Sequence, residues 1–79
     1  MREFQISLRS VQDVQEFVGL ATTMTFTVLV DDNHHRVNGK SFMEMFCLDF
    51  THPLTASAEC SDAEFEQFRT AAQRFLVVK

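Results

Sequence analysis

Apolar and polar side chains alternate along three short segments of the chain, at residues 3–9, 24–30 and 54–59. Such alternation predicts half-buried β-strands, because successive strand side chains point to opposite faces of a sheet. Residues 31–35 are polar and predict a turn, and residues 36–38 predict a short returning strand. The pattern therefore predicts four strands.

Two other segments carry apolar side chains at helical spacing. The first apolar stripe consists of Val11, Val14, Phe17, Val18 and Ala21. It predicts a helix that ends at about residue 20 or 21 and begins with a near capping box of Ser10 and Asp13. The second stripe consists of Phe65, Phe68, Ala72, Phe75 and Leu76. It predicts a last helix that begins with a capping box of Ser61 and Glu64.

A short middle helix is expected between the third and fourth strands. On a helix, Phe42, Met45 and Phe46 would share one face, with Met43 and Cys47 beside it. This apolar perimeter is larger than one short helix can bury. Some of Phe42, Met43 and Phe46 are therefore expected at the surface, where an exposed apolar patch usually marks a partner site.

The predicted order of elements is strand, helix, strand, strand, helix, strand, helix. This order favours an α+β fold, an open-faced two-layer sandwich in which a four-stranded antiparallel sheet carries three helices on one face. The 79 residues fit a single domain spanning residues 1–79. Nine phenylalanines, without tryptophan or tyrosine, predict a core built largely on phenylalanine.

Composition excludes several classes of function. A net charge of −4 argues against nucleic-acid binding, which needs a basic surface. No apolar run approaches the ~20 residues of a membrane span, and no signal peptide is evident, so a cytoplasmic location is expected. Cys47 and Cys60 are expected as reduced thiols. Neither a metal site nor a cofactor is predicted, since zinc requires clustered ligands.

The segment from Lys40 to Leu48, KSFMEMFCL, resembles a known motif. The motif is Lys-Ser-x-Met-Gly-x-Met-x-Leu-Gly of the HPr family, the phosphocarrier proteins of the sugar phosphotransferase system. The order of elements also matches that family, and residues 54–76 resemble its final strand and helix.

The resemblance implies roles for the middle helix. Phe42, Met43 and Phe46 match positions that are exposed in the family and contact partner proteins, whereas Met45 and Leu48 match buried positions.

Ser41 matches a serine that a dedicated kinase phosphorylates in many HPr proteins, which implies a regulatory phosphorylation site. A phosphate there would meet the free N–H groups of a helix N-terminus, and Lys40 would add a positive charge. Glu44 replaces a glycine of the family and would place a negative charge one turn away. The alternative is that Ser41 is only an N-cap.

The start of the first helix departs from the family. There the family has Gly-x-His-x-Arg-Pro-Ala, and its histidine carries a phosphoryl group. Alignment on Phe17-Val18 puts Ser10 at the histidine, Gln12 at the arginine and Asp13 at the proline. Serine would hold phosphate as a stable ester, Gln12 offers no charge, and Asp13 would repel phosphate. Ser10 is therefore expected to be a helix cap and not a catalytic residue.

The three histidines are expected at the same end of the sheet as Ser10. His52 would be closest, because the fourth strand of the family pairs with the first. One hypothesis is that His52, with Arg9 nearby, accepts phosphate in place of the missing histidine; the alternative is a solvated loop residue. His34 and His35 could bind a metal weakly, or simply titrate near neutral pH.

Together these observations predict an HPr-like regulator or adaptor that is not an enzyme and binds a protein partner through the middle helix. Expected partners are a phosphotransferase-system enzyme, a kinase or a regulator, and a homodimer is a further option. Two alternatives stay open, namely a phosphocarrier that uses His52 and a purely structural or dimerisation module. No nucleic-acid or membrane partner is expected.

Overall fold

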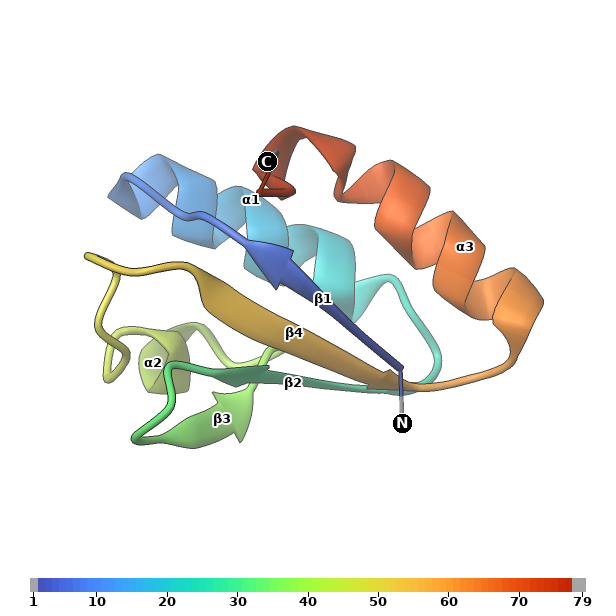
Figure 1. Cartoon of the computed structure of the whole chain (residues 1–79), viewed down its shortest axis with the longest axis horizontal. Coiled ribbons are helices and arrows are strands. Elements are labelled where there is room, and N and C mark those ends of the chain that lie inside the picture. Colours follow the sequence, from blue (N-terminus) through green and yellow to red (C-terminus); the bar gives the residue numbers. More distant parts are fainter. Residues whose placement is uncertain (1, 78–79) are drawn as a thin grey trace.

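Four antiparallel strands form a sheet whose one face is covered by helices (Figure 1). The computed structural model describes residues 2–77. Its elements in chain order are β1 (Arg2–Ile6), α1 (Val11–Thr22), β2 (Thr27–Asp31), β3 (Arg36–Asn38), α2 (Phe42–Met45), β4 (Leu54–Glu59), α3 (Asp62–Ala71) and a short 3₁₀ helix, η1 (Gln73–Phe75). The predicted open-faced α+β sandwich is confirmed.

The strand order β1-β4-β2-β3 gathers three connections at one end of the sheet. β4 pairs antiparallel with both β1 and β2, and places Leu54 opposite Ile6 and Thr55 opposite Asp31. The end of β1, the end of β2 and the start of β4 therefore lie side by side (Figure 1, left). The expected pairing of the first and fourth strands is confirmed, and the loops that carry candidate chemistry share this end.

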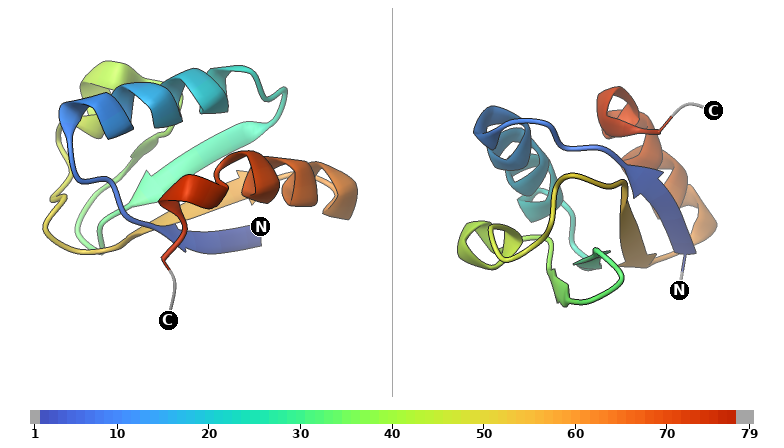
Figure 2. Two further views of the ribbon diagram at one scale, coloured as in Figure 1. Left: turned by 90° about the horizontal axis from the view of Figure 1, so that it is seen from above. Right: turned by 60° about the vertical axis from the view of Figure 1, so that its left-hand side comes forward.

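Phenylalanine side chains join the helices to the sheet. The buried ring of Phe68 on α3 meets Phe4 and Phe26 edge to face, with centroids 5.2 and 5.8 Å apart, and Phe17 of α1 at 6.1 Å. Such pairs add to the free energy gained by burying the rings. Figure 2 shows α1 and α3 running over the same face of the sheet, with α2 beside α1. Met45 ties α2 to this core.

Two predicted strand boundaries are wrong. The first strand ends at Ile6 and not at residue 9, although Leu8 is still buried. The second strand begins at Thr27 and not at residue 24. Met24 still donates its N–H to the carbonyl of Ala21, 3.1 Å away, so the chain continues the turn that ends α1 before it extends.

The last helix is shorter than its apolar stripe suggested. α3 ends at Ala71, and Leu76 lies opposite Ile6 in an isolated strand-like bridge. The N–H of Ser7 donates to the carbonyl of Phe75 at 2.8 Å. Backbone pairing with the free edge of the sheet replaces the last helical turns, while Phe75 still buries its ring.

Candidate functional site

The N-terminus of α1 is capped by side chains of its own first residues. The hydroxyl of Ser10 accepts the N–H of Asp13 at 3.1 Å, and the carboxylate of Asp13 accepts the N–H of Arg9 at 3.0 Å. One amide donor of the first turn, that of Asp13, and the amide of Arg9 just before the helix are thereby satisfied. The expected capping role of Ser10 is confirmed, and Asp13 places a negative charge at the positive end of the helix dipole.

A cation from the C-terminal turn faces this helix start. The Nη2 atom of Arg74 lies 3.7 Å from Oδ1 of Asp13 and also pairs with Glu16. The guanidinium stacks over the ring of Phe75, 4.8 Å from its centroid. Sequence reasoning missed Arg74, because nothing in the local pattern around residue 74 indicates a contact with the first helix.

The segment that enters α2 is fixed to β2 and to the loop before it. Gly39 donates its N–H to the carbonyl of Val28 at 2.8 Å, and a Cβ at Gly39 would lie only 2.8 Å from Cγ1 of Val28. Lys40 donates from Nζ to the carbonyl of Met24 at 2.8 Å. The ammonium group is thus directed at a backbone carbonyl, so the expectation that Lys40 supplies a local charge for Ser41 is weakened.

The short α2 helix is capped by Ser41. Its hydroxyl accepts the N–H of Glu44 at a long 3.4 Å, and its backbone carbonyl accepts that of Met45 at 3.1 Å. Ser41 is half-buried and Glu44 is exposed in the same turn. Ser41 is therefore the N-cap of α2 in the unphosphorylated chain.

Large apolar side chains are exposed on α1 and α2. Val11, Met43 and Phe46 are 57%, 80% and 44% exposed, and they are the large hydrophobic side chains that residues 2–77 leave open to solvent. The ring of Phe42 is half-buried and meets Phe46 edge to face, 4.7 Å between centroids. α1 and α2 lie against each other. We call Val11, Phe42, Met43 and Phe46 the α1–α2 apolar surface.

These exposures correct the expectation for Val11 and agree with the expectations for Met43 and Phe46. Val11 was predicted in the buried stripe of the first helix but is exposed, because its place on the helix lies at the edge of the stripe that faces the sheet. Met43 and Phe46 are at the surface as expected, whereas Phe42 is only partly so. Met45 and Leu48 are buried.

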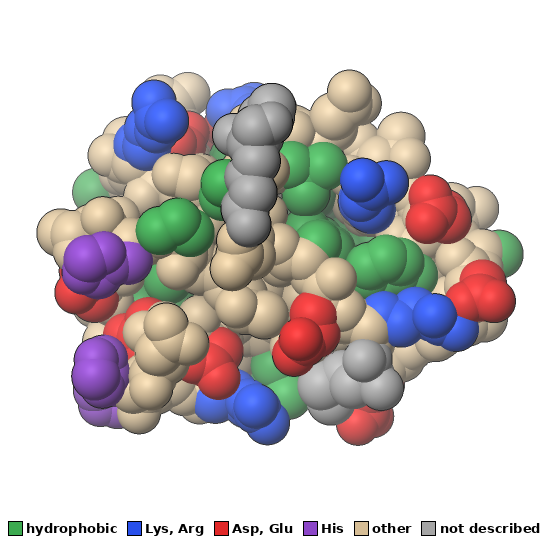
Figure 3. Space-filling view, viewed as in Figure 1, with side chains coloured by type: hydrophobic (Ala, Val, Ile, Leu, Met, Phe, Trp, Pro, Cys, Tyr) green, Lys and Arg blue, Asp and Glu red, His purple; other side chains and the backbone are tan. Residues whose placement is uncertain are grey.

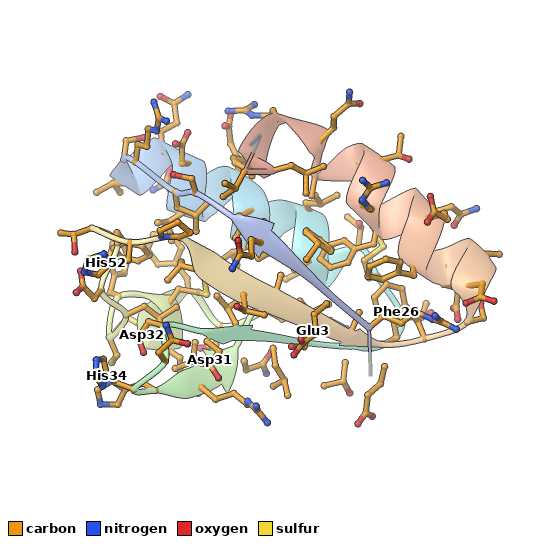
Figure 4. The ribbon with its side chains drawn as sticks, viewed as in Figure 1. Glu3, Phe26, Asp31, Asp32, His34 and His52 are labelled. Carbon is orange, nitrogen blue, oxygen red and sulfur yellow. The ribbon has the colours of Figure 1, made fainter. Side chains whose placement is uncertain are left out.

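The histidines lie on the surface at one end of the sheet. Figure 3 shows the histidine side chains on the left in an upper and a lower patch, and Figure 4 places His34 and His52 on either side of Asp32 in this view. His34, His35 and His52 are all exposed. Within residues 2–77, no three His, Cys, Asp or Glu side chains are arranged to hold a metal ion.

Asp32 is the residue at this end that sequence reasoning missed. Its side chain is only 3% exposed. Oδ1 accepts the N–H groups of His34 and His35 at 2.8 and 2.6 Å, and Oδ2 accepts that of Asp49 at 3.0 Å. These backbone donors, led by His35, hold the pKa of Asp32 far below its usual range. Asp32 therefore joins the β2–β3 turn to the loop after α2.

The two cysteines are free thiols with different surroundings. Cys47 directly follows Phe46 and is exposed, whereas Cys60 is partly buried after β4. Burial, with a smaller effect of the Glu64 carboxylate, raises the pKa of the Cys60 thiol. Cys47 is therefore a natural reporter of the α1–α2 apolar surface.

Comparison with known proteins identifies the fold. No protein-family model and no curated protein matches the chain. The HPr-C-His protein of Thermoanaerobacter tengcongensis is similar in structure, with a TM-score of 0.74 and 21% identity over 92% of each chain. A histidine-containing phosphocarrier protein of Mycoplasma is similar too, with a TM-score of 0.73 and 16% identity over 92% of this chain and 89% of that one. The fold is that of the HPr phosphocarriers.

The start of α1 in this chain is polar and lacks histidine. Ser10 and Asp13 stand in the first turn, and no histidine occurs between residues 1 and 33. No helix within residues 2–77 combines the length and apolar content that crossing a bilayer requires.

Proposed function

We propose that this HPr-like chain is a non-catalytic regulator or adaptor that binds a protein partner through α2. The observation that carries the proposal is that large apolar side chains are exposed on two helices that contact each other. Val11, Met43 and Phe46 come from two elements in contact with each other. An apolar surface of this kind is stabilised when a partner covers it. A phosphotransferase-system enzyme, a kinase or a regulator is the partner class that fits the fold.

The start of α1 supports the non-catalytic part of the proposal. A phosphoryl relay needs an acceptor that releases the group again, and a serine ester is too stable for that step. Asp13 adds a carboxylate in the same turn, and Arg74 is engaged by two carboxylates. An incoming phosphate would meet an anion where it needs a cation.

Ser41 is the site we propose for regulatory phosphorylation. Its hydroxyl lies at the N-terminus of α2, immediately before the half-buried Phe42. A phosphate there would add nearly two negative charges beside the α1–α2 apolar surface, so it would alter partner binding. Glu44 in the same turn opposes this modification.

His52 keeps a phosphocarrier as the alternative function. The residue is exposed and precedes Pro53 in the loop before β4. The carboxylate of Asp49 lies in the same loop as His52, and its negative charge disfavours the approach of a phosphoryl donor. A purely structural or dimerisation module would use the same apolar surface against a second copy.

The proposal is tested by nuclear magnetic resonance titration of the isotope-labelled chain. Two purified probes are used separately: the enzyme that phosphorylates HPr from phosphoenolpyruvate, and the HPr serine kinase. With at least one of the two enzymes, we expect saturable changes in the chemical shifts of Met43, Phe46 and Val11. Phe46→Glu should remove these shifts, while Thr70→Glu, on the exposed face of α3, should retain them.

Two results would contradict the proposal. One is the absence of saturable binding to both enzymes. The other is transfer of an acid-labile phosphoryl group from phosphoenolpyruvate to His52, lost in His52→Ala, which would make the chain a phosphocarrier. Concentration-dependent sedimentation that Phe46→Glu abolishes would instead indicate the dimerisation module.

A further inference from the structure

The loop that follows α2 is held by a carboxylate from another part of the chain. Asp49 donates its N–H to Oδ2 of Asp32, 17 residues earlier and 3.0 Å away. α2 itself spans four residues, far below the length at which a helix is stable alone. The position of Phe46 and Cys47 therefore depends on the contacts made on either side of this single turn.

The carboxylate of Asp32 has two oxygens, one for the β2–β3 turn and one for the loop after α2. One oxygen binds the amides of His34 and His35, and the other binds the amide of Asp49. The N–H of Asp32 also donates to the carbonyl of His35 at 3.1 Å, which closes the turn on itself. An ionised carboxylate can only accept, so its two oxygens suit three amide donors without competition.

The other contacts of the loop are less directional. Leu48 anchors the segment through burial, which fixes depth but not orientation. The carboxylate of Asp49 accepts only from Thr51 within the loop, from its N–H at 2.9 Å and its hydroxyl at 2.6 Å. The bond from Asp49 to Asp32 is thus the polar tie between the end of α2 and the sheet.

We propose that Asp32 is the positioning residue of the α1–α2 apolar surface. The inference rests on the proposed partner binding and adds a requirement to it. The buried carboxylate orients the chain after α2, so that Phe46 is presented in one arrangement before a partner arrives. Preorganisation of this kind raises affinity, because less order has to be imposed on binding. Asp32 itself is too buried to touch a partner.

Asp32→Asn separates acceptance from the turn amides of His34 and His35 from acceptance from the amide of Asp49. The single carbonyl oxygen of asparagine can still accept from the turn amides, but its NH₂ group would face the N–H of Asp49, and two donors cannot bond. Asp49→Asn is the matched control. It removes one negative charge from the same cluster, retains the amide donor of residue 49, and keeps an oxygen for Thr51.

The first readout needs no partner. In Asp32→Asn we expect amide hydrogen exchange at Asp49 to become about tenfold faster or more, as expected for loss of a charge-assisted hydrogen bond. The methyl resonance of Met43 and the ring resonances of Phe46 should move or broaden. Amides of β4 and α3 should lose less protection than the amide of Asp49, because they lose only what the fold as a whole loses. Asp49→Asn should change none of these.

The second readout uses the enzymes named for the proposed function. Asp32→Asn should weaken whichever binds by about tenfold, with Asp49→Asn within twofold of wild type. Equal exchange at residue 49, and equal Met43 and Phe46 resonances, in the two variants would overturn the inference. Absence of binding by wild type would overturn the proposed function alone, since the first readout still decides the role of Asp32.

A backbone change keeps the test decisive if Asp32→Asn does not fold. Ligation at Cys60 allows a synthetic segment in which the N–H of Asp49 is replaced by an ester oxygen. This removes one donor and leaves every side chain, including Asp32, unchanged. The resonances of Met43 and Phe46 should then move as described, and unchanged resonances would contradict the inference.

Discussion

Arg74 and Asp13 lie 3.7 Å apart, from guanidinium Nη2 to carboxylate Oδ1, and so connect the C-terminal turn to the start of α1. Arg74 also pairs with Glu16 on the next turn. These side chains are partly exposed, so the pairs contribute little to the free energy of unfolding. Their effect is on charge, because the guanidinium of Arg74 beside the helix start already has two carboxylate partners.

A histidine placed at Ser10 is therefore not expected to create a phosphocarrier. In Ser10→His the imidazole would be present, but Asp13 would still repel the phosphoryl group and Gln12 would still lack a charge. Incubation with labelled phosphoenolpyruvate and the enzyme that phosphorylates HPr should leave Ser10→His unlabelled. Adding Gln12→Arg and Asp13→Ala to it should allow acid-labile labelling. Stoichiometric label on the single variant would show that Asp13 and Gln12 are irrelevant.

Substitution of Phe46 should affect partner binding, whereas substitution of Phe68 should affect the stability of the fold. Phe46 is 44% exposed, so Phe46→Glu should leave the thermal unfolding midpoint within a few degrees of wild type while partner binding is lost. Phe68 is fully buried against Phe4, Phe17 and Phe26, so Phe68→Ala should lower the free energy of unfolding by about 3–5 kcal/mol. Urea titration followed by circular dichroism measures both. Unfolding of Phe46→Glu would place Phe46 in the core.

Sequence patterns predicted the elements and their order because alternation, helical spacing and capping residues are local. Ser10 and Ser61 cap helices as their spacing indicated. The misplaced boundaries have tertiary causes. Leu76 leaves the helical pattern because the edge of β1 offers backbone partners, which no local periodicity records.

The site was predictable only in part for the same reason. Met43 and Phe46 could be placed at the surface because a short helix cannot bury so many apolar groups. Arg74 and Asp32 could not be assigned, since each acts on a segment distant in sequence. Asp32 lies in a polar turn, where an aspartate is expected to be solvated, and its bond to the amide of Asp49 from a distant segment is not visible in the sequence.

The two thiols should differ in reactivity and in their response to a partner. Cys47 is exposed, whereas burial raises the pKa of Cys60 and lowers its thiolate fraction. Iodoacetamide at neutral pH should therefore modify Cys47 first, as peptide mass mapping would show. A bound partner should slow alkylation of Cys47 and leave Cys60 unchanged. Equal protection of both thiols would indicate a general change in stability rather than a contact at α2.

Acid should weaken the fold through Asp32 and Asp49. Amides of His35, Asp49 and His34 lower the pKa of Asp32, and the hydroxyl and amide of Thr51 lower that of Asp49, in both cases below the ordinary value of 3.8. The unfolded chain then binds protons more readily than the folded one. The stabilisation is present in full above the unfolded pKa and is lost as the pH falls through 3.8 towards the folded pKa.

Urea midpoints at pH 7, 5 and 3 measure this dependence. The midpoint should change little between pH 7 and 5 and fall between pH 5 and 3. Asp32→Asn should have a lower midpoint at pH 7 and a smaller fall on acidification, because its amide does not titrate. Glu66→Gln, on the exposed face of α3, is the control and should fall as wild type does. A wild-type midpoint that rises on acidification would contradict the direction of both pKa shifts.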